Sequence, residues 1–136
     1  MTQKERKNLF DYIYNKYSKE MWIHEGNCGA DKRPYSYIIN KEIVLPKNSF
    51  RNPSEWIVFA LLHEIGHIKT NTTKMKLYEK EFYATQWAAT EARNLKFNIR
   101  TEWKKVYQDY ILDKRQSCVN KKGKNVINKE LLLIKW

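Results

Sequence analysis

Apolar and polar positions along the chain follow a helical period in the longer stretches and a strand-like pattern in the shorter ones. Residues 3 to about 20 repeat apolar side chains at spacings of three and four, which predicts a helix with one face toward the core. The apolar run at residues 21–24 predicts a first strand. Residues 34–39 and 42–46 are rich in β-branched and aromatic side chains and are separated by two residues, which predicts a hairpin.

Pro46 indicates that the second hairpin strand either ends there or lies at a sheet edge. An edge strand beside the next helix would offer unpaired backbone groups to an extended peptide, or it would be an ordinary sheet edge. The sequence pattern leaves both interpretations open.

The segment from Glu55 to about Ile68 is apolar almost all round, which predicts a central helix packed between the sheet and other helices. Asn52 is expected to cap this helix, with Pro53 at its first position. Further helices are predicted over residues 76–95 and from 101 to about 113. The short polar connection that follows the central helix makes it an antiparallel neighbour of the helix at 76–95.

These elements predict a single α+β domain over residues 1–136, in which a small antiparallel or mixed sheet packs against the central helix and two to three further helices. The polar, basic residues from about 114 to 129 predict a loop or mobile arm. The apolar residues 131–136 are expected to dock on the domain, because exposing them would be costly; the alternative is that they hold a partner chain.

The formal net charge of +11 allows two interpretations. It would suit an acidic partner, such as nucleic acid or an acidic protein substrate. Alternatively, the many lysines belong to a solvated surface in a chain that is also rich in Asn, Ile and Tyr. The second interpretation is favoured, because no basic stretch is interleaved with aromatic residues as in a platform for single strands.

Several sequence features concern the compartment. The charged N-terminus lacks the apolar core of a signal peptide, and the longest apolar run, residues 56–62, is too short to span a bilayer. We therefore expect a soluble, cytoplasmic protein without a membrane partner. Cys28 and Cys118 are expected to be free thiols rather than a pair, and their spacing does not suit a thiolate zinc site.

The predicted central helix ends in the pattern His-Glu-x-x-His, formed by His63, Glu64 and His67. On a helix, the two histidines lie one turn apart on the same face, so both imidazoles can reach one ion. Glu64 lies off that face but close enough to act on a water molecule held by the metal. The remaining histidine, His24, is either a ligand from a separate element or, as we favour, a histidine with an ordinary hydrogen-bond partner.

A catalytic zinc site usually has three protein ligands and one open position. Glu81 on the next predicted helix is the best candidate for the third ligand, because it lies on the same side as the small residues that allow close helix packing. Glu79 is the rival, although it points away from that face. The expected cofactor is therefore Zn²⁺, held by His63, His67 and Glu81.

Two motifs together resemble those of a known family. The first is His63-Glu64-Ile65-Gly66-His67, and the second is Glu81-Phe82-Tyr83-Ala84-Thr85-Gln86-Trp87-Ala88. They are similar to the motifs of the ImmA/IrrE-type metallopeptidases of phages and mobile elements, over roughly residues 35 to 95. The resemblance implies a minimal zincin-like fold, Glu81 as the third zinc ligand, and a protein substrate such as a DNA-bound regulator.

Thr85 departs from the family pattern, which has an aspartate that orients a metal-binding histidine at this position. A threonine can still accept a hydrogen bond but brings no charge. Loss of such a carboxylate costs on the order of 10–100-fold in metal affinity or activity. Glu64 is intact, which argues against an inactive enzyme.

The leading prediction is a zinc-dependent metallopeptidase in which Glu64 takes a proton from the attacking water and passes it to the leaving amine. Tyr83 and Tyr78 are candidate donors to the oxyanion. One alternative is a binding or regulatory protein that keeps the zincin fold without proteolysis. A third, suggested only by charge, is a nucleic-acid-binding protein.

Overall fold

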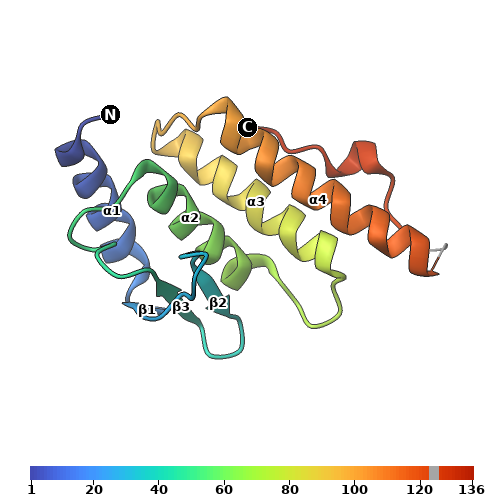
Figure 1. Ribbon diagram of the computed structural model, residues 1–136, viewed down its shortest axis with the longest axis horizontal. Coiled ribbons are helices and arrows are strands. Elements are labelled where there is room, and N and C mark those ends of the chain that lie inside the picture. The colour runs from blue at the N-terminus through green and yellow to red at the C-terminus, as the bar shows by residue number, and fades with distance from the viewer. Residues whose placement is uncertain (123–125) are drawn as a thin grey trace.

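The computed structural model describes residues 1–122 and 126–136. Within these ranges the chain forms four α-helices and a mixed three-stranded sheet, so the α+β class is confirmed (Figure 1). The elements in order are α1 (Gln3–Tyr17), β1 (Trp22–Glu25), β2 (Tyr35–Tyr37), β3 (Glu42–Leu45), α2 (Glu55–Thr70), α3 (Leu77–Asn94), α4 (Thr101–Lys122) and the 3₁₀ helix η1 (Lys129–Leu132).

The sheet has the order β1-β3-β2, with β1 parallel and β2 antiparallel to β3. The predicted hairpin is therefore present as β2 and β3, but its turn has four residues, 38–41, rather than the predicted two. Because β3 lies in the centre, the interpretation of residues 42–46 as an edge strand is wrong; the strand instead ends just before Pro46. β2, which ends at Tyr37, is an edge strand beside α2.

Helix α2 is the centre of the fold: the sheet and α1 lie on one side of it and α3 on the other (Figure 1). Its residues from Val58 to Gly66 are all buried. The cap is Ser54, whose side chain accepts a hydrogen bond from the Ile57 backbone N–H at 3.1 Å. The prediction of Asn52 as cap is wrong, because Asn52 closes an earlier turn and its side chain accepts a hydrogen bond from Gln3.

Helices α2 and α3 pack closely enough to bring their side chains into one site. A Cβ atom at Gly66 would lie 2.4 Å from the backbone oxygen of Ala84, so only glycine fits at this crossing. Ala84, Ala88 and Ala92 are fully buried along the contact, as the small-residue face predicts. The same crossing holds Glu81, one turn before Ala84, over the end of α2.

Helix α4 runs nine residues further than the sequence pattern predicts and ends at Lys122. The prediction of a loop or mobile arm is wrong for residues 114–122, which contain neither Gly nor Pro and include several good helix formers. The part of that prediction at residues 123–125 lies outside the described residues. The chain then returns along α4, where Arg115 donates a hydrogen bond to the Ile127 backbone oxygen at 2.9 Å.

The C-terminal segment docks on the domain, as predicted. Leu132 and Ile134 are buried in a cluster with Tyr78 and Ile111. The two cysteines, Cys28 and Cys118, are free thiols, also as predicted. Among the described residues, each helix is too short or too polar to cross a lipid bilayer.

Candidate metal centre

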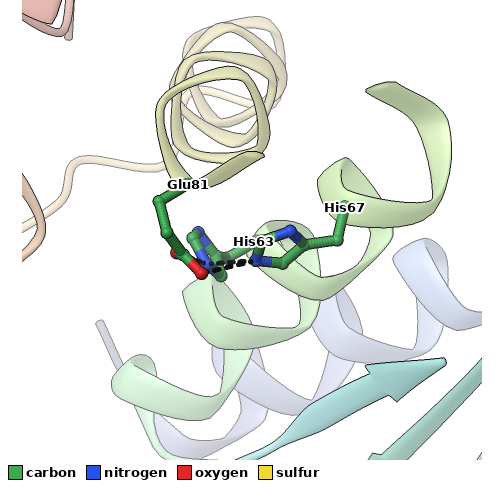
Figure 2. Close-up of side chains that lie close together, drawn as sticks. All are labelled: His63, His67 and Glu81. Carbon is green, nitrogen blue, oxygen red and sulfur yellow. Dashed lines mark hydrogen bonds and ion pairs between the residues drawn. The ribbon is translucent and has the colours of Figure 1, made fainter. Parts of the chain in front are cut away.

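Three side chains converge where α2 crosses α3 (Figure 2). His63 and His67 lie one turn apart on α2, and Glu81 comes from the second turn of α3. The two histidine Nε2 atoms are 3.1 Å apart; the Glu81 carboxylate lies 3.2 Å from Nε2 of His63 and 3.4 Å from Nε2 of His67. One donor atom from each residue therefore lies within 4.8 Å of the others.

These separations suit a small divalent metal ion. Zinc bound tetrahedrally at about 2.0–2.1 Å holds its ligand atoms roughly 3.3–3.4 Å from one another. The separations of 3.1 to 3.4 Å in this site are close to that value. Two imidazoles and one carboxylate form a donor set that is typical of catalytic zinc, and the same set also binds iron(II).

A second set of side chains orients the two imidazoles. Thr85 Oγ1 lies 3.2 Å from His63 Nδ1, and Asn71 Oδ1 lies 2.6 Å from His67 Nδ1. Both contacts engage Nδ1 and leave Nε2 directed at the candidate site; an Nδ1–H that donates to either oxygen would hold the ring in that orientation. Asn71 was not predicted; it is the C-cap residue of α2, and its side chain also donates to the backbone oxygen of Lys80 on α3.

The candidate ligands form a mutually stabilising group of charges. Burial lowers the pKa of His67, but the hydrogen bond from His67 to Glu81 and the nearby carboxylates outweigh it and raise this pKa to about 9. Burial also raises the pKa of Glu81, yet hydrogen bonds from His63 and His67 hold it well below its ordinary value. The carboxylate of Glu81 is thus ionised and ready to bind a cation.

Glu64 lies beside this group with a different environment. It is only 8% exposed and accepts a hydrogen bond from the Ser36 hydroxyl of β2 at 3.2 Å. Burial raises the pKa of Glu64, and the neighbouring histidines and Ser36 offset that rise only in part. A carboxyl whose pKa is raised above its ordinary value is suited to exchange a proton with a reacting group.

The four residues open into a cavity of about 240 Å³. Its walls include Trp56 and Ala60 of α2, Arg33 and Pro34 before β2, and Val106, Tyr107 and Tyr110 of α4. The ring of Tyr107 lies 4.9 Å from that of His63 and stacks on Trp56 at 5.4 Å. Burial, with the charges of Glu64 and Glu81, raises the pKa of Tyr107 far above its ordinary range, so its hydroxyl keeps its proton.

The structure does not bring the predicted tyrosines into this cavity. Tyr78 is fully buried in the C-terminal cluster, where its hydroxyl accepts a hydrogen bond from the Ile127 backbone N–H at 3.1 Å. Tyr83 is 40% exposed, lies against Phe82 and does not line the cavity. Neither residue lines the cavity, so the structure does not support the prediction of Tyr78 and Tyr83 as oxyanion donors.

Glu79 and His24 are the other two residues that the sequence offers as candidate ligands. Glu79, the rival to Glu81, accepts a hydrogen bond from the Lys76 backbone N–H and caps α3. His24 lies 2.6 Å from the carboxylate of Glu42, so it has an ordinary partner, as favoured from the sequence. Neither residue is part of the candidate metal centre.

Tyr107 and Arg33 are cavity residues that the sequence did not point to. The apolar pattern of α4 marked Tyr107 only as a core position, and Arg33 lies in a loop without periodic pattern. Comparisons of the chain with protein-family models, with curated proteins and with solved structures find no match. The functional interpretation therefore rests on the geometry of the site and on the two sequence motifs.

Proposed function

We propose that this protein is a zinc-dependent metallopeptidase with a minimal zincin-like domain. The observation that carries the proposal is the convergence of His63, His67 and Glu81 beside the buried carboxyl of Glu64. Three ligands of this type, with a proton-exchanging carboxyl next to them, are what metal-assisted hydrolysis of a peptide bond needs. An open cavity lies directly over the group.

His63, His67 and Glu81 would hold the ion, while Thr85 and Asn71 fix the two imidazole rings. When bound, zinc supplies a Lewis acid that polarises the substrate carbonyl and lowers the pKa of a water molecule. Glu64 accepts a proton from the attacking water at its carboxylate oxygen. It then donates that proton to the leaving amine, and its raised pKa serves both transfers.

Tyr107 replaces Tyr78 and Tyr83 as the candidate donor to the developing oxyanion. It lines the cavity, and its hydroxyl keeps a proton at neutral pH. Arg33, which also lines the cavity, adds positive charge on the same side as Tyr107 and lowers the pKa of that hydroxyl slightly. Donors of this kind stabilise a transition state when they already point at the developing charge.

The substrate in this proposal is a protein or peptide. The resemblance to ImmA/IrrE-type metallopeptidases supports a phage or mobile-element regulator, such as a DNA-bound repressor. Thr85 stands where the family has an aspartate, yet its hydroxyl contacts Nδ1 of His63, as that aspartate would be expected to do. A neutral partner there supports a site of lower metal affinity rather than a missing one.

The test compares the parent with Glu64→Gln on a peptide library derived from a whole proteome, with new N-termini mapped by mass spectrometry. Gln has the same shape but cannot accept the proton, so the variant should bind as much zinc as the parent and lose cleavage. Equal cleavage by both would contradict the mechanism. Zinc binding without cleavage by the parent would favour the non-proteolytic alternative, which the uncharged Thr85 also supports.

A further inference from the structure

One face of the sheet carries a set of aromatic side chains that the proposed peptidase site does not use. Side chains alternate between the two faces of a strand, and the register aligns Trp22 with Glu42 and Tyr37 with Glu42. Trp22 and His24 of β1 therefore lie on the same face as Tyr35 and Tyr37 of β2. We call these four residues the aromatic face.

The opposite face of the sheet is buried against the domain. Ile23, Ile43 and Leu45 belong to the main core, and Ser36 donates to Glu64. Residue Ser36 therefore points toward the metal centre, while its neighbours Tyr35 and Tyr37 point away from it. A ligand on the aromatic face would lie across the sheet from Glu64.

Two of the four rings of the aromatic face are exposed, whereas His24 and Tyr35 are half-buried. Trp22 is 62% exposed and Tyr37 is 51% exposed. The Trp22 and His24 rings stack at 3.8 Å with an interplanar angle of 16°, and Tyr35 meets Tyr37 edge to face at 5.5 Å. Exposing rings of this size has a cost that a binding role would explain.

Positive charge borders the aromatic face at Trp22. A groove beside this residue is lined by Lys19 and Lys41, both exposed. Glu20 in the same groove is paired with Lys69, whereas within the described part of the chain neither Lys19 nor Lys41 takes part in an ion pair. The carboxylate of Glu42, in the middle of the face, is bound by His24 at 2.6 Å.

We infer that the aromatic face and its two lysines bind single-stranded nucleic acid. Exposed rings give stacking surfaces for unpaired bases, and nearby lysines attract the phosphates. The net charge of +11 adds long-range attraction for such a partner. This arrangement is not evident from the sequence, because the rings come from two strands, β1 and β2, that lie on either side of β3 in the fold.

The inference can be tested by fluorescence anisotropy with a labelled oligothymidine of about fifteen nucleotides. The parent should bind it more tightly than a duplex of equal length. Trp22→Ala should weaken binding by at least about fivefold, as expected from the loss of one stacked base, and Trp22→Phe should retain most of the affinity. Tyr12→Ala removes a ring that is 54% exposed on α1 and should change nothing.

Salt dependence gives a second readout. Replacing Lys19 and Lys41 by Gln should reduce the slope of log K against log salt by about 1.4, which corresponds to two lost phosphate contacts. Replacing Lys129 and Lys135 by Gln makes the same change in net charge away from the aromatic face and should leave the slope nearly unchanged. Glu64→Gln should bind like the parent, so failure of the peptidase proposal would leave this result unaffected.

Several results would overturn the inference. One is a parent that fails to bind the oligonucleotide even at about 50 mM salt. Others are binding that survives Trp22→Ala, or a preference for the duplex. Light scattering that finds a dimer dependent on Trp22 would instead assign the aromatic face to contact between two copies of the chain.

Discussion

The hydroxyl oxygen of Thr85 lies 3.2 Å from Nδ1 of His63 in a fully buried position of α3. This contact joins the two helices that supply the candidate metal ligands. It also explains how the site tolerates a residue without charge: an imidazole Nδ1–H needs an acceptor, and a hydroxyl provides one.

Replacing Thr85 with Val tests this contact, because Val keeps the shape and removes the acceptor. His63 is 7% exposed, so its Nδ1–H would be left buried without a partner. We expect zinc affinity to fall roughly tenfold, measured by competition with a chromophoric chelator. Thr85→Ser is the matched control and should bind like the parent; equal affinity of Val and Ser variants would rule out an orienting role.

The close contact between α2 and α3 at Gly66 can be tested by the sign of the stability change on Gly66→Ala. A Gly-to-Ala change inside an ordinary helix stabilises it by about 1 kcal/mol. At Gly66, however, the new Cβ would lie 2.4 Å from the Ala84 backbone oxygen and would force α2 and α3 apart. Gly66→Ala should therefore lower the midpoint of thermal unfolding by several degrees. A rise in the midpoint would show that the two helices are not in close contact there.

The pH dependence of metal binding follows from His67. In the metal-free protein its pKa is raised to about 9, so at pH 7 the ring carries a proton that a metal must displace. Apparent zinc affinity should rise as the pH increases from about 6 to about 9. Calorimetry at pH 7 in buffers of different ionisation enthalpy should find about one proton released from this site per ion. Release near zero would mean that His67 is already neutral.

The stability of the metal-free protein, unlike its apparent zinc affinity, should fall as the pH becomes alkaline. Because the pKa of His67 is raised from 6.5, its stabilising contribution is complete below 6.5 and is lost as the pH passes about 9. The lowered pKa of Glu81 contributes stability above 4.5 that is lost in acid. Urea unfolding of the metal-free protein should therefore show its highest stability between pH 4.5 and pH 6.5, where both contributions are present. A stability that rises steadily through pH 9 would contradict the pairing.

Local patterns in the sequence were enough to predict that His63, His67 and Glu81 lie together. His63 and His67 are one helical turn apart. Because the connection between α2 and α3 is short, the start of α3, which carries Glu81, has to lie near the end of α2. The hairpin of β2 and β3 was predictable for the same reason. In each case, the residues that come together are near in sequence, so periodicity and loop length decide the geometry.

The rest depends on contacts between distant segments. Tyr107 approaches His63 across more than forty residues, and only the packing of α4 on α2 decides that it, rather than Tyr78 or Tyr83, lines the cavity. The length of α4 was missed because polar helix formers without an apolar stripe resemble a loop. Asn71 was missed because its role as a helix cap and as a partner of His67 needs three-dimensional contacts.

The most direct test of the metal centre is the zinc content of the purified parent beside two variants. The parent should hold about one zinc ion per chain, and Glu81→Ala should lose it under the same dialysis, because two histidines alone bind zinc weakly. Glu79→Ala, two residues away on the same helix, should keep the ion although it removes the α3 cap contact. Circular dichroism controls for folding. Zinc retained by Glu81→Ala, or absent from the parent, would contradict a centre built from His63, His67 and Glu81.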